Sequence, residues 1–239
     1  MAYRDKTFLG IIPARGGSKG LTGKNTRLLC GKPLIGWSIE AGLKSRYLDE
    51  VVVTTDDPAI RKVALKYGAQ APFLRPKALA TDKSTTIDAL KHTVDFYRKN
   101  LGKCFDYLVL LEPTSPLREI SDIDEPIRRL LAQPSAQAIV GICRAEASHP
   151  AFLMLKNTAR FLKGYQKKKI SSLRRQDIDS VYFPEGTIYV SEIKTLFDKK
   201  TFYHEKTLGY EVPRWKSPEV DEIHDLVMIE ALMKYRKQK

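Results

Sequence analysis

The chain has 239 residues, of which 43% are hydrophobic, and can therefore bury one full core in a single domain. Its formal net charge of +13 favours anionic partners such as nucleotides, phosphosugars, nucleic acid or a membrane surface. Three widely spaced cysteines argue against a disulfide framework or a zinc site. No secretory leader is visible, and no apolar run approaches the roughly 20 residues of a membrane span, so we expect a cytoplasmic protein.

Strand and helix patterns alternate along the chain, which predicts an α/β fold with a largely parallel sheet. Apolar runs predict strands at residues 7–13, 50–55, 107–111, 138–143 and 187–191. Helical spacing predicts helices at residues 33–45, 84–100, 121–133 and 222–236, and another between a cap at Asp57 and a stop at Gly68. Residues 144–181 are basic and less periodic, and we interpret them as an insertion.

A glycine-rich basic loop directly follows the first predicted strand, where residues 13–20 read PARGGSKG. In open α/β sheets, ligands bind beyond the carboxyl ends of strands, and glycines let backbone N–H groups approach a phosphate. Arg15, Lys19 and Lys24 add the positive charge that a triphosphate needs. The loop matches neither the dinucleotide fingerprint nor the P-loop, which disfavours a dehydrogenase or a kinase. A basic surface turn is the alternative interpretation, and the position after a buried strand disfavours it.

Several blocks then resemble those of one family, the acylneuraminate cytidylyltransferases or CMP-sialic acid synthetases. The loop at residues 12–25 resembles the family's signature, and further blocks follow in the family's order at residues 74–82, 112–118, 175–176, 184–189 and 219–225. The resemblance covers nearly the whole chain. It implies a Rossmann-like three-layer α/β/α nucleotidyltransferase fold with a mostly parallel sheet, formed by one domain over residues 1–239. It also implies a homodimer with residues 144–181 as a small dimerisation insertion.

The resemblance further implies an enzyme that transfers CMP from CTP to the anomeric C2 hydroxyl of a nonulosonic acid and releases pyrophosphate. The expected nucleotide contacts are Arg15, Gly16, Ser18, Lys19, Lys24, Asn25, Arg75 and Thr86. The expected sugar contacts are Glu112, Thr114, Ser115, Arg175, Gln176 and Glu185. Arg15, Lys24 and Asp221 are the residues expected to serve catalysis.

Two acidic residues, Glu219 and Asp221, precede the last predicted helix. They alternate in a segment expected to be extended, so their side chains should leave the chain on one side. Hard cations prefer carboxylate ligands and can bridge phosphate oxygens. We therefore predict Asp221 as a ligand of Mg²⁺ or Mn²⁺ and Glu219 as a second or water-mediated ligand, and either could help to accept the hydroxyl proton. The alternative is that both acids only complement the helix dipole.

Three residues depart from the family pattern: Glu112 stands in place of Gln, Glu185 in place of Asn, and Glu219 in place of Asp. Carboxylates facing the sugar would repel the carboxylate of the substrate unless they were paired or protonated. We therefore hypothesise a nonulosonic acid other than N-acetylneuraminic acid, with legionaminic or pseudaminic acid derivatives as candidates.

Three alternative functions stay open. The first is a CMP transferase for 3-deoxy-manno-octulosonate or its 8-amino analogue, which the block at residues 112–118 disfavours. The second is a nucleic-acid-binding protein, which the charge supports but for which no binding motif is visible. The third is a catalytically silent relative that binds a nucleotide.

Overall fold

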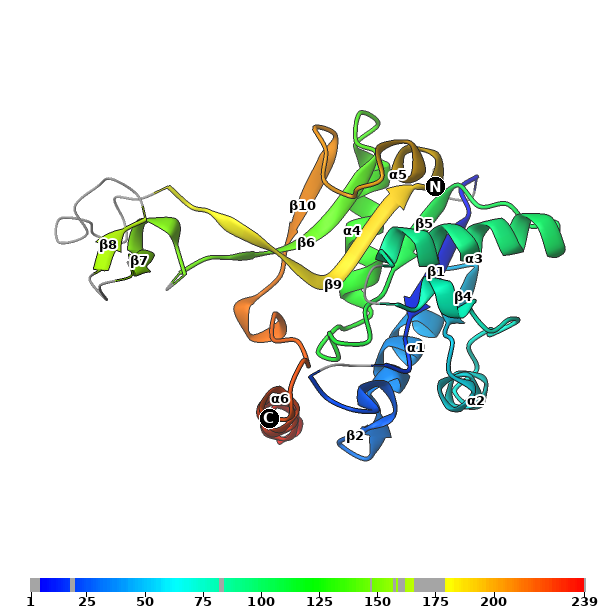
Figure 1. Cartoon of the computed structure of the whole chain (residues 1–239). Helices are drawn as coiled ribbons and strands as arrows, with labels where there is room; N and C mark the ends of the chain where they lie inside the picture. The colour runs from blue at the N-terminus through cyan, green and yellow to red at the C-terminus, as the bar shows by residue number, and fades with distance from the viewer. Residues whose placement is uncertain are drawn as a thin grey trace.

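The computed structural model describes residues 5–17, 20–81, 84–146, 148–156, 158, 162–165 and 179–238. Its centre is a six-stranded sheet with the order β10-β6-β9-β5-β1-β4 (Figure 1). These strands are β1 (Phe8–Pro13), β4 (Glu50–Thr54), β5 (Tyr107–Leu110), β6 (Ala138–Arg144), β9 (Tyr182–Glu192) and β10 (Thr207–Glu211). Only β9 runs antiparallel to its neighbours in this sheet, β5 and β6. The predicted α/β fold with a mostly parallel sheet is confirmed.

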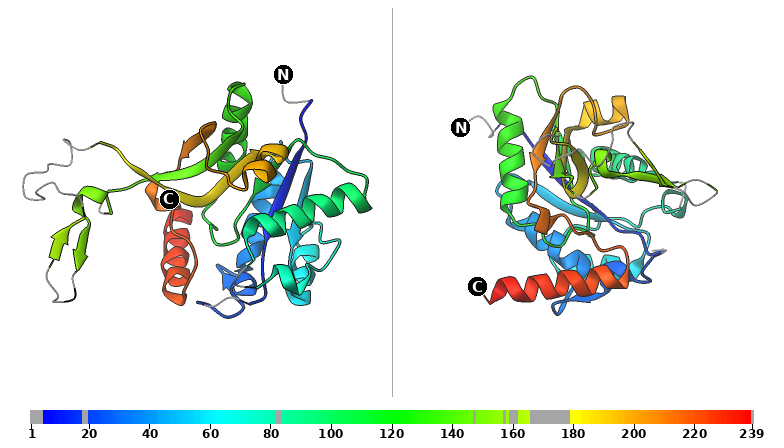
Figure 2. Two further views of the ribbon diagram at one scale, coloured as in Figure 1. Left: turned by 45° about the horizontal axis from the view of Figure 1, so that its top comes forward. Right: turned by 90° about the vertical axis from the view of Figure 1, so that its left-hand side faces the viewer.

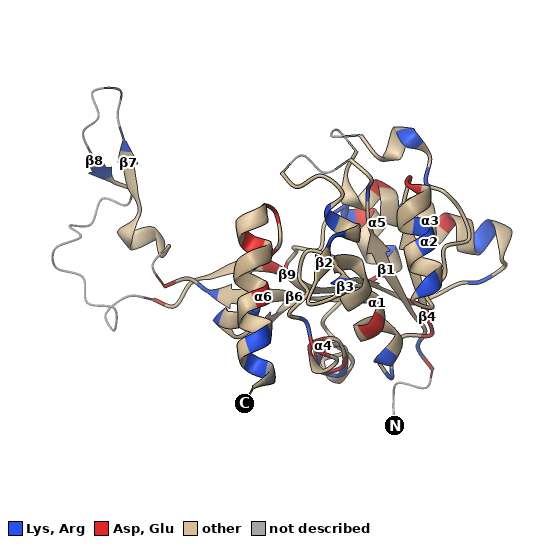
Figure 3. Cartoon of the chain, turned by 90° about the horizontal axis from the view of Figure 1, so that it is seen from below, with Lys and Arg blue, Asp and Glu red and all other residues tan. Residues whose placement is uncertain are grey.

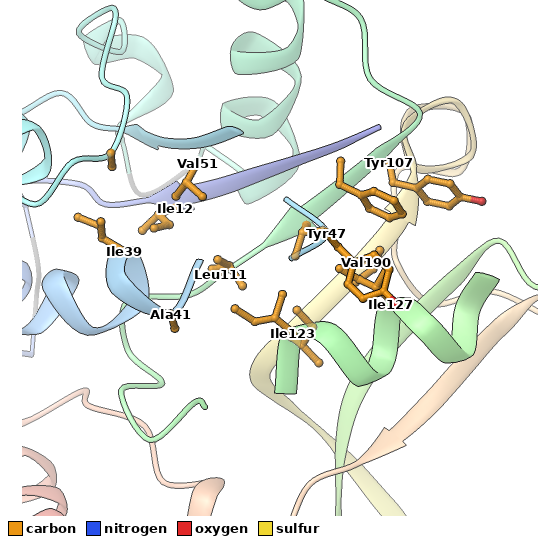
Figure 4. Packing of buried hydrophobic residues seen from close by; sticks show 14 of the residues in the cluster. Ile12, Ile39, Ala41, Tyr47, Val51, Tyr107, Leu111, Ile123, Ile127 and Val190 are labelled. Atoms are coloured by element: carbon orange, nitrogen blue, oxygen red, sulfur yellow. The ribbon is translucent and has the colours of Figure 1, made fainter. Parts of the chain in front are cut away.

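Helices cover both faces of the sheet because successive strand residues point to opposite sides. Ile12 and Val51 belong to the hydrophobic cluster under α1, α2 and α4, part of which Figure 4 shows. Their neighbours Ile11 and Val52 belong to a second cluster, under α3 and α5. The helices are α1 (Leu34–Lys44), α2 (Pro58–Lys66), α3 (Thr86–Asn100), α4 (Ser121–Ala132), α5 (Ile193–Lys199) and α6 (Ile223–Lys237). The layers follow the order α/β/α that the resemblance implied.

Helix α6 packs against the segment that follows β1. Leu226, Ile229 and Met233 join Leu21 and Leu29 in a third buried cluster. This packing brings residues 217–222, which precede α6, to the carboxyl ends of the central strands. The helix predicted at residues 222–236 is confirmed, and the side chain of its first residue, Ile223, is exposed.

The ends of α2 and α3 are set by capping side chains and, after α2, by a glycine. Asp57 accepts hydrogen bonds from the N–H groups of Ala59 and Ile60 at the start of α2. Gly68, with a φ of 88°, follows the end of α2, as predicted. Thr85 and Asp88 form a capping box at α3, so this helix begins two residues later than the predicted residue 84.

Some elements were missed or shortened by the sequence patterns. Helix α5, strand β10 and the pairs β2–β3 (Leu28–Leu29, Lys32–Pro33) and β7–β8 (Met154–Lys156, Leu162–Gly164) were not predicted. Neither were the short 3₁₀ helices at Lys24–Thr26, Lys77–Leu79, Pro150–Phe152 and Arg214–Lys216. Strand β9 is longer than the predicted 187–191, because its first half also pairs with β6, beyond an irregularity between Val140 and Ile142.

The predicted insertion at residues 144–181 lies partly outside the described residues. Its described part contains the β7–β8 hairpin, which projects away from the central sheet beyond the ends of β6 and β9 (Figures 1 and 2). Within the described part of the chain, no helix has the length and apolar character needed to span a membrane.

Candidate active site

A pocket of about 610 Å³ opens at the carboxyl ends of β1 and β5. Ligands of open α/β sheets bind at this edge, next to the point where the strand order reverses. The pocket wall includes many of the predicted site residues, namely Arg15, Lys24, Asn25, Arg75, Thr86, Glu112, Thr114 and Asp221. Residues from five separate segments of the sequence thus meet in one concave site.

The loop after β1 is held in shape by its own hydrogen bonds. The side-chain amide of Asn25 donates to the carbonyl oxygen of Arg15 at 3.1 Å, and Gly16 N–H donates to Asp56 at 3.1 Å. A Cβ at Gly16 would lie 2.8 Å from the carboxylate of Asp57, so this position favours glycine. Asn25 lines the pocket, whereas Gly16 does not.

Arg75 places a buried guanidinium at the pocket wall, with only 6% of the residue exposed. Its backbone N–H donates to the carbonyl of Thr55 at 2.7 Å, and its Nη2 lies 3.9 Å from Asp56. Burial lowers the pKa of Arg75, the charge of Asp56 opposes this change, and Arg15 adds to it. The Nε group has no hydrogen-bond partner, although buried polar groups are normally paired. Arg75 therefore has an unused donor beside the pocket.

The four acidic residues at the start of α6 make different contacts. Glu222 and Asp225 form the capping box of α6, and Asp225 also accepts from the N–H of Asp221 at 3.0 Å. Asp221 keeps its carboxylate at the pocket, largely exposed, 3.0 Å from the ammonium of Lys24. Glu219 accepts from Gly186 N–H at 2.7 Å and lies outside the pocket lining. Since the cap is supplied by other residues, helix capping does not account for Glu219 or Asp221.

Asp221 presents an exposed carboxylate at the pocket that could bind a metal ion. Among the described residues, no cluster of three or more metal-ligating side chains is present. Magnesium is usually held by one or two carboxylates together with substrate phosphates, so it needs no cage made by the protein alone. Asp221 fits such a site, and Glu219 can contribute only the oxygen that does not bind Gly186.

The predicted sugar end of the pocket is acidic and largely buried. Glu112 lines the pocket, and its pKa is raised to about 7, mainly by burial and then by the charge of Glu219. Glu185 is only 3% exposed and accepts from the N–H and hydroxyl of Thr187 at 3.1 and 2.6 Å. Burial raises the pKa of Glu185 to about 7 as well, and its second oxygen has no partner. Neither Glu185 nor Ser115 lines the pocket, in contrast to Thr114.

Two tyrosines near this acidic end were missed by the sequence patterns. They are Tyr189 and Tyr203, and the centroids of their rings lie 6.5 Å apart. Burial raises the pKa of both phenols, and the charge of Glu112 contributes to each change. Tyr189 belongs to the block at residues 184–189, whereas nothing in the local sequence pointed to Tyr203.

Four predicted contacts lie outside the described residues, namely Ser18, Lys19, Arg175 and Gln176.

Comparison with known proteins gives the family of the chain. Residues 9–239 match the family model described as cytidylyltransferase. The chain is 35% identical over 203 residues to CMP-N,N'-diacetyllegionaminic acid synthase of Legionella pneumophila, with 84% of each protein covered. It is 31% identical over 229 residues to pseudaminic acid cytidylyltransferase of Campylobacter jejuni, covering 95% of this chain and 96% of that protein.

Two further matches are a relative that is longer than this chain and a solved structure with a similar fold. The N-acylneuraminate cytidylyltransferase of Escherichia coli is 31% identical over 233 residues, covering 97% of this chain but only 54% of its own length. A solved structure of CMP:2-keto-3-deoxy-manno-octonic acid synthetase complexed with CTP has a TM-score of 0.70 at 20% identity, and the likeness covers 96% of this chain and 99% of that one. This structure supports the nucleotidyltransferase fold. The chain belongs to the cytidylyltransferase family.

Proposed function

We propose that the protein transfers CMP from CTP to the C2 hydroxyl of a nonulosonic acid and releases pyrophosphate. The observation that carries this proposal is that Arg15, Lys24 and Arg75 line the same pocket as Glu112 and Asp221. The basic side suits a triphosphate, and the remaining space can hold a second substrate beside it. The relatives named for legionaminic, pseudaminic and N-acylneuraminic acids support this class of substrate.

In this proposal the reaction depends on positioning two substrates and neutralising charge. The C2 oxygen of the sugar attacks the α-phosphorus of CTP, and a new P–O bond forms as the bond to the bridging oxygen breaks. Pyrophosphate leaves with the electron pair of that bond. Arg15, Lys24 and Arg75 hold the phosphates, and Asn25 and Thr86 help to hold the nucleotide. Asp221 is open to solvent at the pocket and can accept the hydroxyl proton.

We also propose that Mg²⁺ or Mn²⁺ assists the reaction, with Asp221 as the main ligand and Glu219 as a second or water-mediated one. When bound, such an ion neutralises charge on the phosphate oxygens. This proposal is supported by the exposed carboxylate of Asp221 at the pocket, whose partner Lys24 occupies a place that a metal cation could take.

The sugar is expected to differ from N-acetylneuraminic acid. With its pKa raised to about 7, Glu112 ionises near neutral pH, and its ionised form only accepts hydrogen bonds, whereas the glutamine usual in the family both donates and accepts. Glu112 therefore favours a substituent that donates hydrogen bonds to the protein. N-acetylneuraminic acid used at least as well as legionaminic and pseudaminic acids would contradict this proposal.

We further propose a cytoplasmic homodimer that uses residues 144–181. The described part of the β7–β8 hairpin and its flanks exposes large apolar side chains, namely Leu153, Met154, Leu155, Leu162 and Tyr165. Gathered on one projecting element, such side chains are typical of a surface that binds another protein.

The alternative functions have less support. The likeness to the octonic acid synthetase is one of fold, at 20% identity. A nucleic-acid-binding face would need its basic residues gathered together, but Figure 3 shows acidic and basic residues interspersed over the side in view.

Pyrophosphate release tests the proposal directly. Purified protein is given Mg²⁺, each of CTP, UTP, ATP and GTP, and a panel of legionaminic, pseudaminic, N-acetylneuraminic and octulosonic acids. Release that requires both CTP and a nonulosonic acid is the expected result. Binding of CTP without release by any sugar acid would instead indicate a silent relative.

A further inference from the structure

Arg118 is a buried cation behind the pocket for which the reaction has no direct use. The residue is 6% exposed and does not line the pocket. Its guanidinium donates four hydrogen bonds, to the carbonyls of Thr187, Glu112 and Gly186 and to the hydroxyl of Ser38. These partners belong to β9, to the end of β5 and to α1, so one side chain connects three elements at the sugar end of the site.

The acceptors of Arg118 support pocket residues. The carbonyl oxygen of Glu112 accepts from Nη2 of Arg118 at 2.9 Å and from the hydroxyl of Ser38 at 3.0 Å. Gly186 accepts from Nη2 at 3.1 Å, and the N–H of the same glycine donates to the carboxylate of Glu219 at 2.7 Å. The guanidinium thus fixes the backbone that carries Glu112 and the backbone that holds Glu219.

The charge of Arg118 acts on the same residues. Burial is the main cause that lowers the pKa of Arg118 to about 10. This change is opposed by the negative charges of the nearby carboxylates, namely Glu185, Glu112, Asp122 and Glu219. Arg118 therefore stays protonated at neutral pH. Removing the cation would leave three carbonyl oxygens without this donor and would remove the positive charge that favours ionisation of the surrounding carboxyl groups.

We propose that Arg118 is a positioning residue for the sugar acid, which sets the place of the Glu112 and Glu219 carboxyls without touching either substrate. The inference rests on the proposed function. Arg75 interacts instead with Thr55 and Asp56, which follow β4, so the nucleotide end should be independent of this arrangement.

The test compares Arg118→Lys and Arg118→Met with a matched control, Lys216→Met. Lys216 is also a buried cation, 5% exposed, and lies 2.7 Å from Asp122 and 2.8 Å from Glu119. It lies outside the pocket lining, and of the carboxylates around Arg118 it pairs only with Asp122, so its removal reports the loss of a buried ion pair that does not hold Glu112 or Glu219. Three quantities are measured for each variant: the Kd for CTP by calorimetry, and the KM for the sugar acid and kcat by pyrophosphate release.

Arg118→Met is expected to raise the KM for the sugar by about tenfold or more, with the Kd for CTP within about twofold of wild type. Arg118→Lys keeps the charge but loses the planar set of donors, so it should recover only part of that loss. Lys216→Met should leave the KM for the sugar and the Kd for CTP unchanged, even where it lowers the melting temperature. Equal losses in sugar and nucleotide binding, or an unchanged KM for the sugar in the Arg118 variants, would overturn the inference.

Ser38→Ala keeps the test valid if Arg118→Met fails to fold. It removes one acceptor of Arg118 and one donor to Glu112, and it should raise the KM for the sugar by about two- to threefold with CTP binding retained. Wild-type KM values in both Ser38→Ala and Arg118→Lys would overturn the proposal. A wild-type protein that binds CTP and turns over no sugar acid would instead refute the proposed function, and the inference with it.

Discussion

The ammonium of Lys24 lies 3.0 Å from the carboxylate of Asp221, across 197 positions of the sequence. The two residues connect the loop after β1 to the segment before α6. The same two segments touch again at Gly20, where a Cβ would lie 2.6 Å from the carbonyl oxygen of Asp221. The C-terminal part of the chain therefore completes the wall of the pocket. Lys24, the proposed phosphate-binding residue, and Asp221, the proposed metal ligand, are in contact before any ligand binds.

Asp221→Asn is expected to lower kcat by about 100-fold or more, because the neutral amide binds a divalent cation poorly and accepts no proton at neutral pH. Pyrophosphate release at saturating CTP and sugar measures this loss. Glu230→Gln is the control: it removes an acid elsewhere on α6 that pairs with Lys234 and does not line the pocket, and it should leave kcat near that of wild type. Similar kcat values for the two variants would refute the assignment of Asp221.

Arg75→Met is expected to weaken CTP binding by about tenfold or more, since hydrogen bonds to charged groups contribute about 1.5–3 kcal/mol. Calorimetry measures the Kd without any need for turnover. Arg61→Met is the matched control, because Arg61 donates to the carbonyl of Ala71 at 2.9 Å and does not line the pocket. Unchanged CTP affinity in Arg75→Met would show that the unused donor of this residue points away from the nucleotide.

Glu185→Gln is expected to reduce the pH dependence of stability. The pKa of Glu185 rises from 4.5 to about 7 on folding, mainly through burial. The folded state therefore binds this proton more tightly, and the stability it contributes is complete below pH 4.5 and is lost as the pH rises through about 7. Glutamine cannot ionise, so the loss of stability between pH 5 and pH 8 should shrink by up to about 3 kcal/mol.

Chemical denaturation at the two pH values measures this difference. Glu211→Gln, at an exposed glutamate in β10, should retain the pH dependence of the wild type. A Glu185→Gln variant that loses as much stability as the wild type would show that Glu185 is not the residue responsible.

Leu155→Asp combined with Leu162→Asp is expected to convert a dimer into a monomer, because two charges would have to be buried in the interface. Both leucines are exposed on the β7–β8 hairpin. Sedimentation velocity measures the mass in solution. Leu101→Asp, at an exposed leucine beyond the end of α3, should leave the mass unchanged. A wild-type protein that sediments as a monomer would refute the proposed dimer.

The regular parts of the fold could be predicted from the sequence because their signals are local. Strands β1, β4 and β5 are short apolar runs, and Asp57 caps α2 as predicted. Helix α5 has only seven residues, too few to show a helical period, and β10 has a glycine at its centre and one buried side chain, Tyr210, so neither leaves a pattern. The extension of β9 depends on its partner β6, which a single sequence does not reveal.

Predicted site residues line the pocket where a motif follows a buried strand, as at Arg15 and Glu112. The proposed role of Arg118 and the position of Tyr203 near Glu112 depend on contacts between residues far apart in the chain, such as Arg118 with Gly186, and no spacing rule identifies them. Glu185 and Ser115 belong to matched blocks but lie behind the pocket wall. A motif therefore locates the region of a site, whereas the orientation of each side chain follows from tertiary packing.

The most direct test of the central claim is the product formed from CTP and a nonulosonic acid labelled with ¹⁸O at the C2 hydroxyl. The proposed reaction predicts a CMP–sugar conjugate, detected by mass spectrometry, that keeps the label in the bridge between C2 and phosphorus, together with one pyrophosphate per conjugate. Failure to form a conjugate with any nonulosonic acid, or a conjugate that has lost the label, would contradict the attack of the sugar oxygen on the α-phosphorus.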